Sequence, residues 1–425
     1  MNVVGIGTDI VECLRIAQMV ERHHELLRRL LLRVESQLRS EGLVVPMEVV
    51  VAECILAKNV RVPDMVQGDV LAQMSALRQG ERDVLQLLEE YGIEDIKNYM
   101  TDIIDYTERI TRSEIEGLPD GSWEFTDYID DDGIEPDPIA IKVKVTIKGD
   151  EMLVDFTGTS PQAKGSINPN LPFTKSAVYA CVRCLISPDV PTNTGFFRCI
   201  DVLAPEASLV NPVLPAPVAA RGLTGFRLAN VIMGALAGLA PDRIPACEVG
   251  GDTGISVGGY RADRSAFVFL EFLFSGWGGR PDRDGIDGCA SIVVNFSNNP
   301  AEVVEAEYPL EILQYGFLAD TGGPGKYRGG LGIVREYRFT EEEGVLQIRS
   351  DRHQSRAYGL AGGMPGAASS NVLNPEGDAE VLPAKTLVNL RRGDILRHTL
   401  AGAGGHGDPC ERDPDAVLDD VRNEK

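Results

Sequence analysis

Residues 271–338 read EFLFSGWGGRPDRDGIDGCASIVVNFSNNPAEVVEAEYPLEILQYGFLADTGGPGKYRGGLGIVREYR. Glycine-rich turns, aromatic side chains and many charges stand here between short runs that are typical of β-strands. Glycine is favoured where the backbone takes a positive φ or where another group must come close. A core that had only to fold would not need so many neighbouring glycine, arginine and acidic positions. The stretch therefore predicts the wall of a pocket, with the rest of the chain as its support.

The bulk composition narrows the class of protein. The chain has 425 residues, 43% of them hydrophobic and 25% charged, which is ordinary for a globular protein of two or three domains. A net charge of −23 argues against nucleic-acid and anionic-membrane partners, because both need basic patches. The sequence has no run of 18 apolar residues and no basic, apolar leader at its start. Eight scattered cysteines fit reduced thiols, so we expect a cytoplasmic protein.

Hydrophobic periodicity predicts a mixed α+β fold, with a helical N-terminal region followed by a larger β-rich region with interspersed helices. A helical stripe ends before Gly92, a glycine suited to a helix C-terminus, and Pro63 suits a helix start. The stripe consists of Val70, Met74, Leu77, Val84, Leu88 and Tyr91. Apolar residues then alternate with polar ones over 139–147, which predicts a half-buried strand. We expect a helical region over 41–134, a mixed region over 135–409 and an acidic tail over 410–425.

Residues 120–137 contain eight acidic side chains and no Lys or Arg. The run Asp130-Asp131-Asp132 raises the question of a cation site. Nothing nearby supplies the ligand spacing of a calcium loop, so a solvated acidic loop is the favoured interpretation.

The first residues differ in character from the rest. GIGTDIVE at 5–12, RI at 15–16 and ERH at 21–23 resemble the opening of holo-acyl-carrier-protein synthases over about residues 1–24. In that family the aspartate at the position of Asp9 helps to hold magnesium. The later glutamate and lysine motif of the family has no counterpart here. We therefore interpret residues 1–40 as a fusion fragment with one strand and one basic helix.

Residues 41–409 resemble the hydantoinase B family, which includes 5-oxoprolinases and subunits of acetone and acetophenone carboxylases. The motifs run in the order and spacing of that family. They are VDFTGTSPQAKGSIN at 154–168, NTGFFRCIDVLAPEASLVNP at 193–212, GGRPDRDGIDG at 278–288, NNPAEVVEAEYPL at 298–310, DTGGPGKYRGGLGIVREYRF at 320–339, GLAGGMPG at 359–366 and GGHGDP at 404–409.

The resemblance implies a B-type subunit that opens cyclic amide rings such as lactams and hydantoins. It also implies a partner A subunit that binds ATP and Mg²⁺, with no cofactor in this chain. Family members usually carry Asn-Asp-Pro, Gly-Gly-Thr-His and His-His-x-Asp-x-Gly-Gly segments, some of which hold a metal in the carboxylase branch. None of these segments occurs here, so the sequence is expected to be an N-terminally truncated member without the family's metal site.

Charged side chains of the glycine-rich motifs are the candidates for chemistry. A carboxylate acts as a general base if burial raises its pKa, and arginine binds phosphate or carboxylate through two hydrogen bonds. The predicted catalytic residues are Asp284, Asp287 and His353. The predicted substrate-binding residues are Arg280, Arg283, Glu307, Arg328 and Arg352. A structural salt bridge or turn cap is the competing interpretation for each of them.

Three other functions remain open. The chain could be a catalytically incomplete member that binds or acts as a scaffold. It could belong to the acetone or acetophenone carboxylase branch. A weaker alternative is a holo-acyl-carrier-protein synthase fragment.

Overall fold

The computed structural model describes residues 57–60, 62–251 and 253–425. The strand and helix expected over residues 1–40 lie outside this part of the chain. Contacts divide the chain into two units between Gly92 and Ile93. The described part of the first unit holds α4 (Ala57–Asn59) and α5 (Pro63–Tyr91). Pro63 begins α5, and Gly92 ends it with a φ of 81° and a 2.9 Å hydrogen bond to the Leu88 carbonyl, as predicted.

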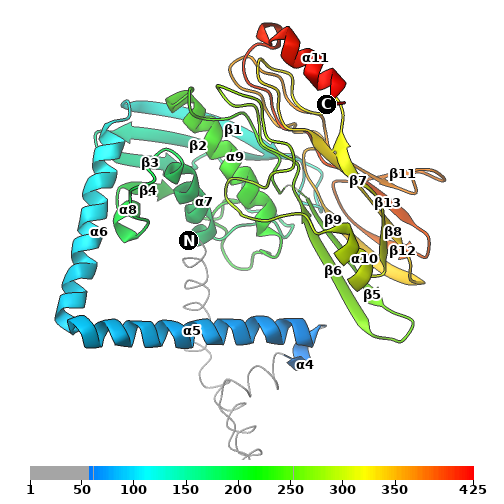
Figure 1. Ribbon diagram of the computed structural model, residues 1–425, viewed down its shortest axis with the longest axis horizontal. Helices are drawn as coiled ribbons and strands as arrows, with labels where there is room; N and C mark the ends of the chain where they lie inside the picture. The colour runs from blue at the N-terminus through cyan, green and yellow to red at the C-terminus, as the bar shows by residue number, and fades with distance from the viewer. Residues whose placement is uncertain (1–56, 61, 252) are drawn as a thin grey trace, which may run out of the picture. The chain divides into compact units, whose positions relative to one another are not determined.

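The second unit begins with a four-stranded sheet covered by helices (Figure 1). Its strands run in the order β1 (Gly121–Ile129), β2 (Ile139–Lys148), β3 (Glu151–Asp155) and β4 (Ile200–Leu203). The associated helices are α6 (Ile93–Glu116), α7 (Leu171–Arg183), α8 (Thr194–Phe197) and α9 (Arg221–Leu239). The alternation over 139–147 is confirmed, because the apolar residues of β2 point into the core beneath α7 and α9.

Helix α9 lies in the centre of this core. Within the part of the chain that the structure describes, it alone is long and apolar enough to cross a membrane, but 89% of the relevant window is buried inside the protein. Helix α9 packs against α7, β1 and β2. Its apolar character therefore serves protein packing.

Two further sheets pack face to face around a second core. One has the order β12 (Lys385–Arg391), β9 (Glu343–Arg349), β5 (Thr253–Tyr260) and β6 (Ala266–Leu273). The other has the order β11 (Glu380–Leu382), β10 (Ser370–Leu373), β13 (Ile395–Thr399), β8 (Gly332–Phe339) and β7 (Leu310–Leu318). The short helix α10 (Ala301–Glu307) packs on β7, and α11 (Pro414–Arg422) follows near the C-terminus (Figure 1). The mixed α+β class is confirmed.

The interpretation of residues 120–137 as a solvated loop is wrong in two respects. Residues 121–129 form strand β1, which lies inside the range expected to be helical. Asp127, Asp130 and Asp132 are buried, with exposed fractions of 8%, 1% and 7%. Backbone N–H groups and arginine side chains satisfy these carboxylates, and this compensation allows acidic residues to be buried.

Three glycine-rich segments that are far apart in sequence meet along a fourth, residues 401–407. This segment accepts hydrogen bonds from the N–H groups of Gly323, Gly279 and Leu360, at 2.7, 2.8 and 3.0 Å. A β-carbon on Gly402 would lie 1.8 Å from the Thr321 carbonyl oxygen. One on Gly404 would lie 1.9 Å from the Tyr358 carbonyl oxygen. Backbone packs directly on backbone here, which only glycine allows.

Candidate functional site

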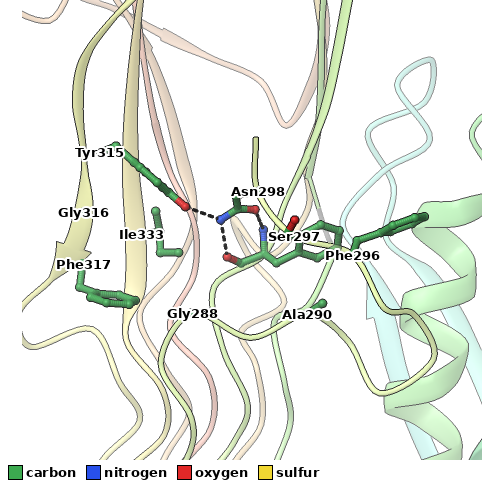
Figure 2. Close-up of a pocket in the computed structure, with 10 residues that line it drawn as sticks. Gly288, Ala290, Phe296, Ser297, Asn298, Tyr315, Gly316, Phe317 and Ile333 are labelled. Atoms are coloured by element: carbon green, nitrogen blue, oxygen red, sulfur yellow. Dashed lines mark hydrogen bonds between the residues drawn. The ribbon is translucent and has the colours of Figure 1, made fainter. Parts of the chain in front are cut away.

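A cavity of about 490 Å³ opens between strand β7 and the loops that follow β6 (Figure 2). Its lining residues all lie within 271–338, the stretch that the sequence singled out. They are Phe274, Gly288, Ala290, Phe296, Ser297, Asn298, Tyr315, Gly316, Phe317 and Ile333. Four of them are aromatic and none is charged. A volume in this range, lined by aromatic rings and by polar groups, falls within the sizes of small-molecule sites.

Asn298 is the fixed polar group of this cavity. Its Oδ1 accepts a 2.9 Å hydrogen bond from the Phe274 N–H, and its Nδ2 donates to the Phe274 carbonyl at 3.1 Å. The same Nδ2 donates to the hydroxyl of Tyr315 at 2.9 Å (Figure 2). Because a backbone N–H can only donate, it fixes which end of the amide is oxygen. Both N–H groups of Asn298 are then in use, and the Tyr315 hydroxyl is held as an acceptor.

Arg335 lies beneath Tyr315. Its guanidinium carbon is 4.3 Å from the centre of the Tyr315 ring, and its Nη2 lies 3.3 Å from Oε1 of Glu271. Both charged side chains are buried. Glu271 also accepts hydrogen bonds from the Tyr337 hydroxyl at 2.5 Å and the Asn299 N–H at 3.0 Å. Burial raises the pKa of Glu271, and Arg335 opposes that rise. The cation under the ring is thus matched by a carboxylate.

The predicted acidic residues Asp284 and Asp287 lie outside the lining of this cavity, in a chain of ion pairs. Arg412 contacts both oxygens of Asp284, at 2.7 and 2.9 Å, and Arg328 contacts both oxygens of Asp287, at 3.0 and 3.1 Å. Asp420 of α11 joins the two arginines, at 2.5 Å from Arg412 and 3.2 Å from Arg328. The network fixes α11 to the glycine-rich loops.

The ion pairs decide the charge state of these carboxylates. Burial alone would raise the pKa of Asp284, but Arg412 and the Arg328 N–H outweigh it and hold the pKa below its usual value. Arg328 and the Leu331 N–H likewise outweigh burial at Asp287 and lower its pKa. A general base was expected to need a raised pKa, and neither aspartate has one. Their catalytic role stays a prediction, while their contacts are those of a structural network.

Three other predicted binding residues also contact protein groups. Arg280 donates to the Asp284 carbonyl at 2.8 and 3.0 Å. Arg283 pairs with Asp282 at the exposed surface. The backbone carbonyl of Glu307, at the end of α10, accepts a hydrogen bond from Arg261. None of these side chains lines the cavity.

Arg352 lies in a separate, buried cluster of charges. Its Nη2 is 3.0 Å from Oδ2 of Asp127 and 3.1 Å from Sγ of Cys247. Arg227 also pairs with Asp127, at 3.3 Å, and with Asp351, at 2.5 Å. The cluster joins β1, α9 and the loop after β9, and sequence reasoning missed Asp127, Arg227 and Asp351. Its arginines are fully buried, and the cluster joins elements that belong to the two cores of the second unit. The substrate-binding role of Arg352 stays a prediction.

His353 adjoins the same cluster in a chain of neutral hydrogen bonds. Its Nε2 lies 2.9 Å from the Ser350 hydroxyl, which also accepts from Asn371 at 2.9 Å. Asn371 Oδ1 in turn lies 2.6 Å from Nδ1 of His398. Burial lowers the pKa of His353, and burial lowers that of His398 to about 3. Both imidazoles are therefore favoured in their neutral form near pH 7. His398 is buried and His353 is half-buried, and neither lines the cavity.

A profile of the Hydantoinase B/oxoprolinase family matches residues 36–409. The chain belongs to the hydantoinase B/oxoprolinase family. The motifs quoted from the sequence predicted this membership with an end at the same residue. The glycine-rich segments around Gly279, Gly323 and Leu360, and the end of the segment 401–407 on which they meet, lie in those motifs.

A curated relative and two solved structures are similar to most of the chain. It is 33% identical over 381 residues to the B-type subunit of a putative D-/L-hydantoinase from Pseudomonas sp. (strain NS671), covering 86% of this chain and 64% of the relative. The crystal structure of the ATP-dependent caprolactamase from Pseudomonas jessenii is similar with a TM-score of 0.78 and 26% identity, over 88% of this chain and 66% of that chain. A nucleotide-free acetone carboxylase shares the fold, with a TM-score of 0.75 and 18% identity over 85% and 54% of the two chains.

This hydantoinase B-type chain thus spans about two thirds of the length of the hydantoinase and caprolactamase relatives. In the carboxylase branch we expected a metal on segments that this sequence does not contain. Over residues 57–60, 62–251 and 253–425, no group of three or more His, Cys, Asp or Glu side chains is arranged to hold a metal ion.

Arg412→Ala tests whether the ion-pair network holds α11. The substitution removes both contacts to Asp284 and the contact to Asp420, so amide protection in α11 should fall by roughly ten- to a hundredfold, as for one charged hydrogen bond. Hydrogen exchange followed by mass spectrometry measures this change. Arg422→Ala is the matched control, because Arg422 is exposed and its ion pair among the described residues is with Asp419 on the same helix. Equal protection in the two variants would contradict the network.

Arg352→Ala separates a structural role from a substrate-binding role. The substitution removes a guanidinium that pairs with the buried carboxylate of Asp127. The free energy of unfolding, measured by urea titration, should therefore fall by about 3–5 kcal/mol. Arg392→Ala removes an exposed pair with Glu342 and should leave stability nearly unchanged. A stable Arg352→Ala protein with weakened ligand binding would instead support the predicted substrate contact.

Proposed function

We propose that this chain is the B-type component of an ATP-dependent enzyme that opens cyclic amide rings together with an ATP-binding A subunit. The observation that carries the proposal is family membership over residues 36–409 combined with an uncharged, aromatic cavity inside the family's own motifs. The hydantoinase and caprolactamase relatives are named for such rings, and several relatives are subunits of larger enzymes. Because the reaction consumes ATP, we place it in the cytoplasm.

The chemistry of a lactam explains why the A subunit and this chain would have different roles. The ring nitrogen leaves poorly, so water alone opens the ring slowly. Transfer of the γ-phosphoryl group of ATP to the carbonyl oxygen, on the A subunit with Mg²⁺, would convert that oxygen into a good leaving group and release ADP. A first water then adds to the same carbon, and the ring nitrogen takes up a proton and leaves as the C–N bond breaks, which gives an acyl phosphate. A second water attacks this acyl phosphate, so phosphate is released and the ring-opened acid remains. This chain would bind and orient the ring for that sequence.

Reconstitution with an A-type subunit from the same organism tests the proposal. The substrates are caprolactam, hydantoin and 5-oxoproline with Mg-ATP, and the readouts are ring-opened acid by mass spectrometry and ADP release. We expect product from at least one ring only when both subunits are present. Full turnover by the A subunit alone would contradict the proposal. A stable complex without turnover of any ring would favour a binding or scaffold role.

A further inference from the structure

We propose that the cavity lined by Asn298 and Tyr315 binds a cyclic amide that carries no charge, with the Tyr315 hydroxyl donating to the ring carbonyl. The identity of the ring rests on the proposed function, but its charge selectivity follows from the cavity itself. Within the ring-opening family, this distinguishes lactams and uncharged hydantoins from 5-oxoproline, which is a carboxylate at neutral pH.

The direction of the hydrogen bonds assigns the donor. The Asn298 amide gives one N–H to the Phe274 carbonyl and the other to the Tyr315 oxygen. A tyrosine oxygen that accepts this bond keeps its own proton for another acceptor. The hydroxyl belongs to a lining residue that is 45% exposed, so its proton is available to a ligand in the cavity. A carbonyl oxygen is the matching group on an amide ring.

The charges beneath the cavity explain why the ligand is neutral. The guanidinium carbon of Arg335 lies 4.3 Å from the centre of the Tyr315 ring in a cation–π contact, so the positive charge nearest this wall is already engaged by protein groups. Glu271 lies 3.3 Å from the same guanidinium and offsets its charge. None of the ten lining residues is charged. A carboxylate entering the cavity would therefore lose hydration without gaining a counter-ion, which is costly.

The cavity walls fit the rest of such a ligand. The rings of Phe274, Phe296 and Phe317 line the cavity together with Tyr315. Aromatic faces contact the flat amide and the apolar methylene groups of a ring, and aromatic surface contributes strongly to ligand binding. Phe296 and Phe317 are 59% and 53% exposed, so ligand binding would remove large apolar surfaces from water.

The test compares two ligands that differ only in charge. 5-Oxoproline and its neutral amide, 5-oxoprolinamide, share one ring, and caprolactam is a second neutral probe. Binding to the full-length chain is measured by calorimetry and by saturation-transfer NMR, without ATP or the partner. We expect 5-oxoprolinamide and caprolactam to bind at least tenfold more tightly than 5-oxoproline. Equal or tighter binding of 5-oxoproline, or no binding of any ring at millimolar concentration, would overturn the inference.

The Tyr315→Phe substitution tests the hydroxyl alone, because it removes this group and keeps the aromatic ring over Arg335. We expect the neutral probes to bind roughly tenfold more weakly, the size of one hydrogen bond, with an unchanged melting temperature. Tyr260→Phe, at a 70% exposed tyrosine outside the cavity, is the control and should bind like the native chain. Unaltered binding by Tyr315→Phe would overturn the assignment of the donor.

The two proposals fail separately. If neutral rings bind with this selectivity but no ring is opened in the presence of an A subunit, the proposed function is wrong and this inference stands. If the rate of ring opening depends neither on the charge of the ligand nor on the Tyr315→Phe substitution, this inference is wrong and the proposed function stands.

Discussion

The close approach of backbone to backbone along residues 401–407 is the constraint on which the rest of the second unit depends. Segments around Gly279, Gly323 and Leu360 all donate hydrogen bonds to this short stretch. Any side chain at Gly402 or Gly404 would overlap a carbonyl oxygen. The glycines are therefore not a sign of a loose loop. They allow four segments that are far apart in the sequence to form backbone hydrogen bonds with one another at one place in the fold.

This centre positions the features that matter for function. The loop through Gly279 continues to Asp284 and Asp287, whose ion pairs with Arg328 and Arg412 attach α11. The same loop supplies Gly288 and Ala290 to the cavity. On the other side, β7 presents Tyr315 and β8 places Arg335 under it. The charged groups thus stabilise the frame, and neutral groups line the space that a ligand would fill.

The sequence predicted local elements well, because their causes are local. Alternation gave the strand at 139–147, and Pro63 and Gly92 bounded α5 correctly. The importance of residues 271–338 was also visible, since glycines and aromatics crowd there. Hydrophobic periodicity cannot predict which residues contact each other when they are far apart in the sequence. Asp127 meets Arg227 and Arg352 only in the folded chain, so a run of acids looked like a solvated loop. For the same reason, the sequence carried no signal that Asn298 and Tyr315 are partners, and it did not show that the conspicuous Asp287 pairs with Arg328.

Hydrogen exchange at single glycine amides tests the central claim most directly. The amides of Gly279, Gly323 and Gly404 bond to the carbonyls of Gly404, Ala403 and Cys247. If the glycine-rich segments form a rigid frame, these amides should exchange as slowly as those in the core strand β8. They should exchange far more slowly than the amide of Gly377, which lies in a turn between β10 and β11. Exchange at the rate of Gly377 would contradict the account, because the cavity would then lack the fixed support described here.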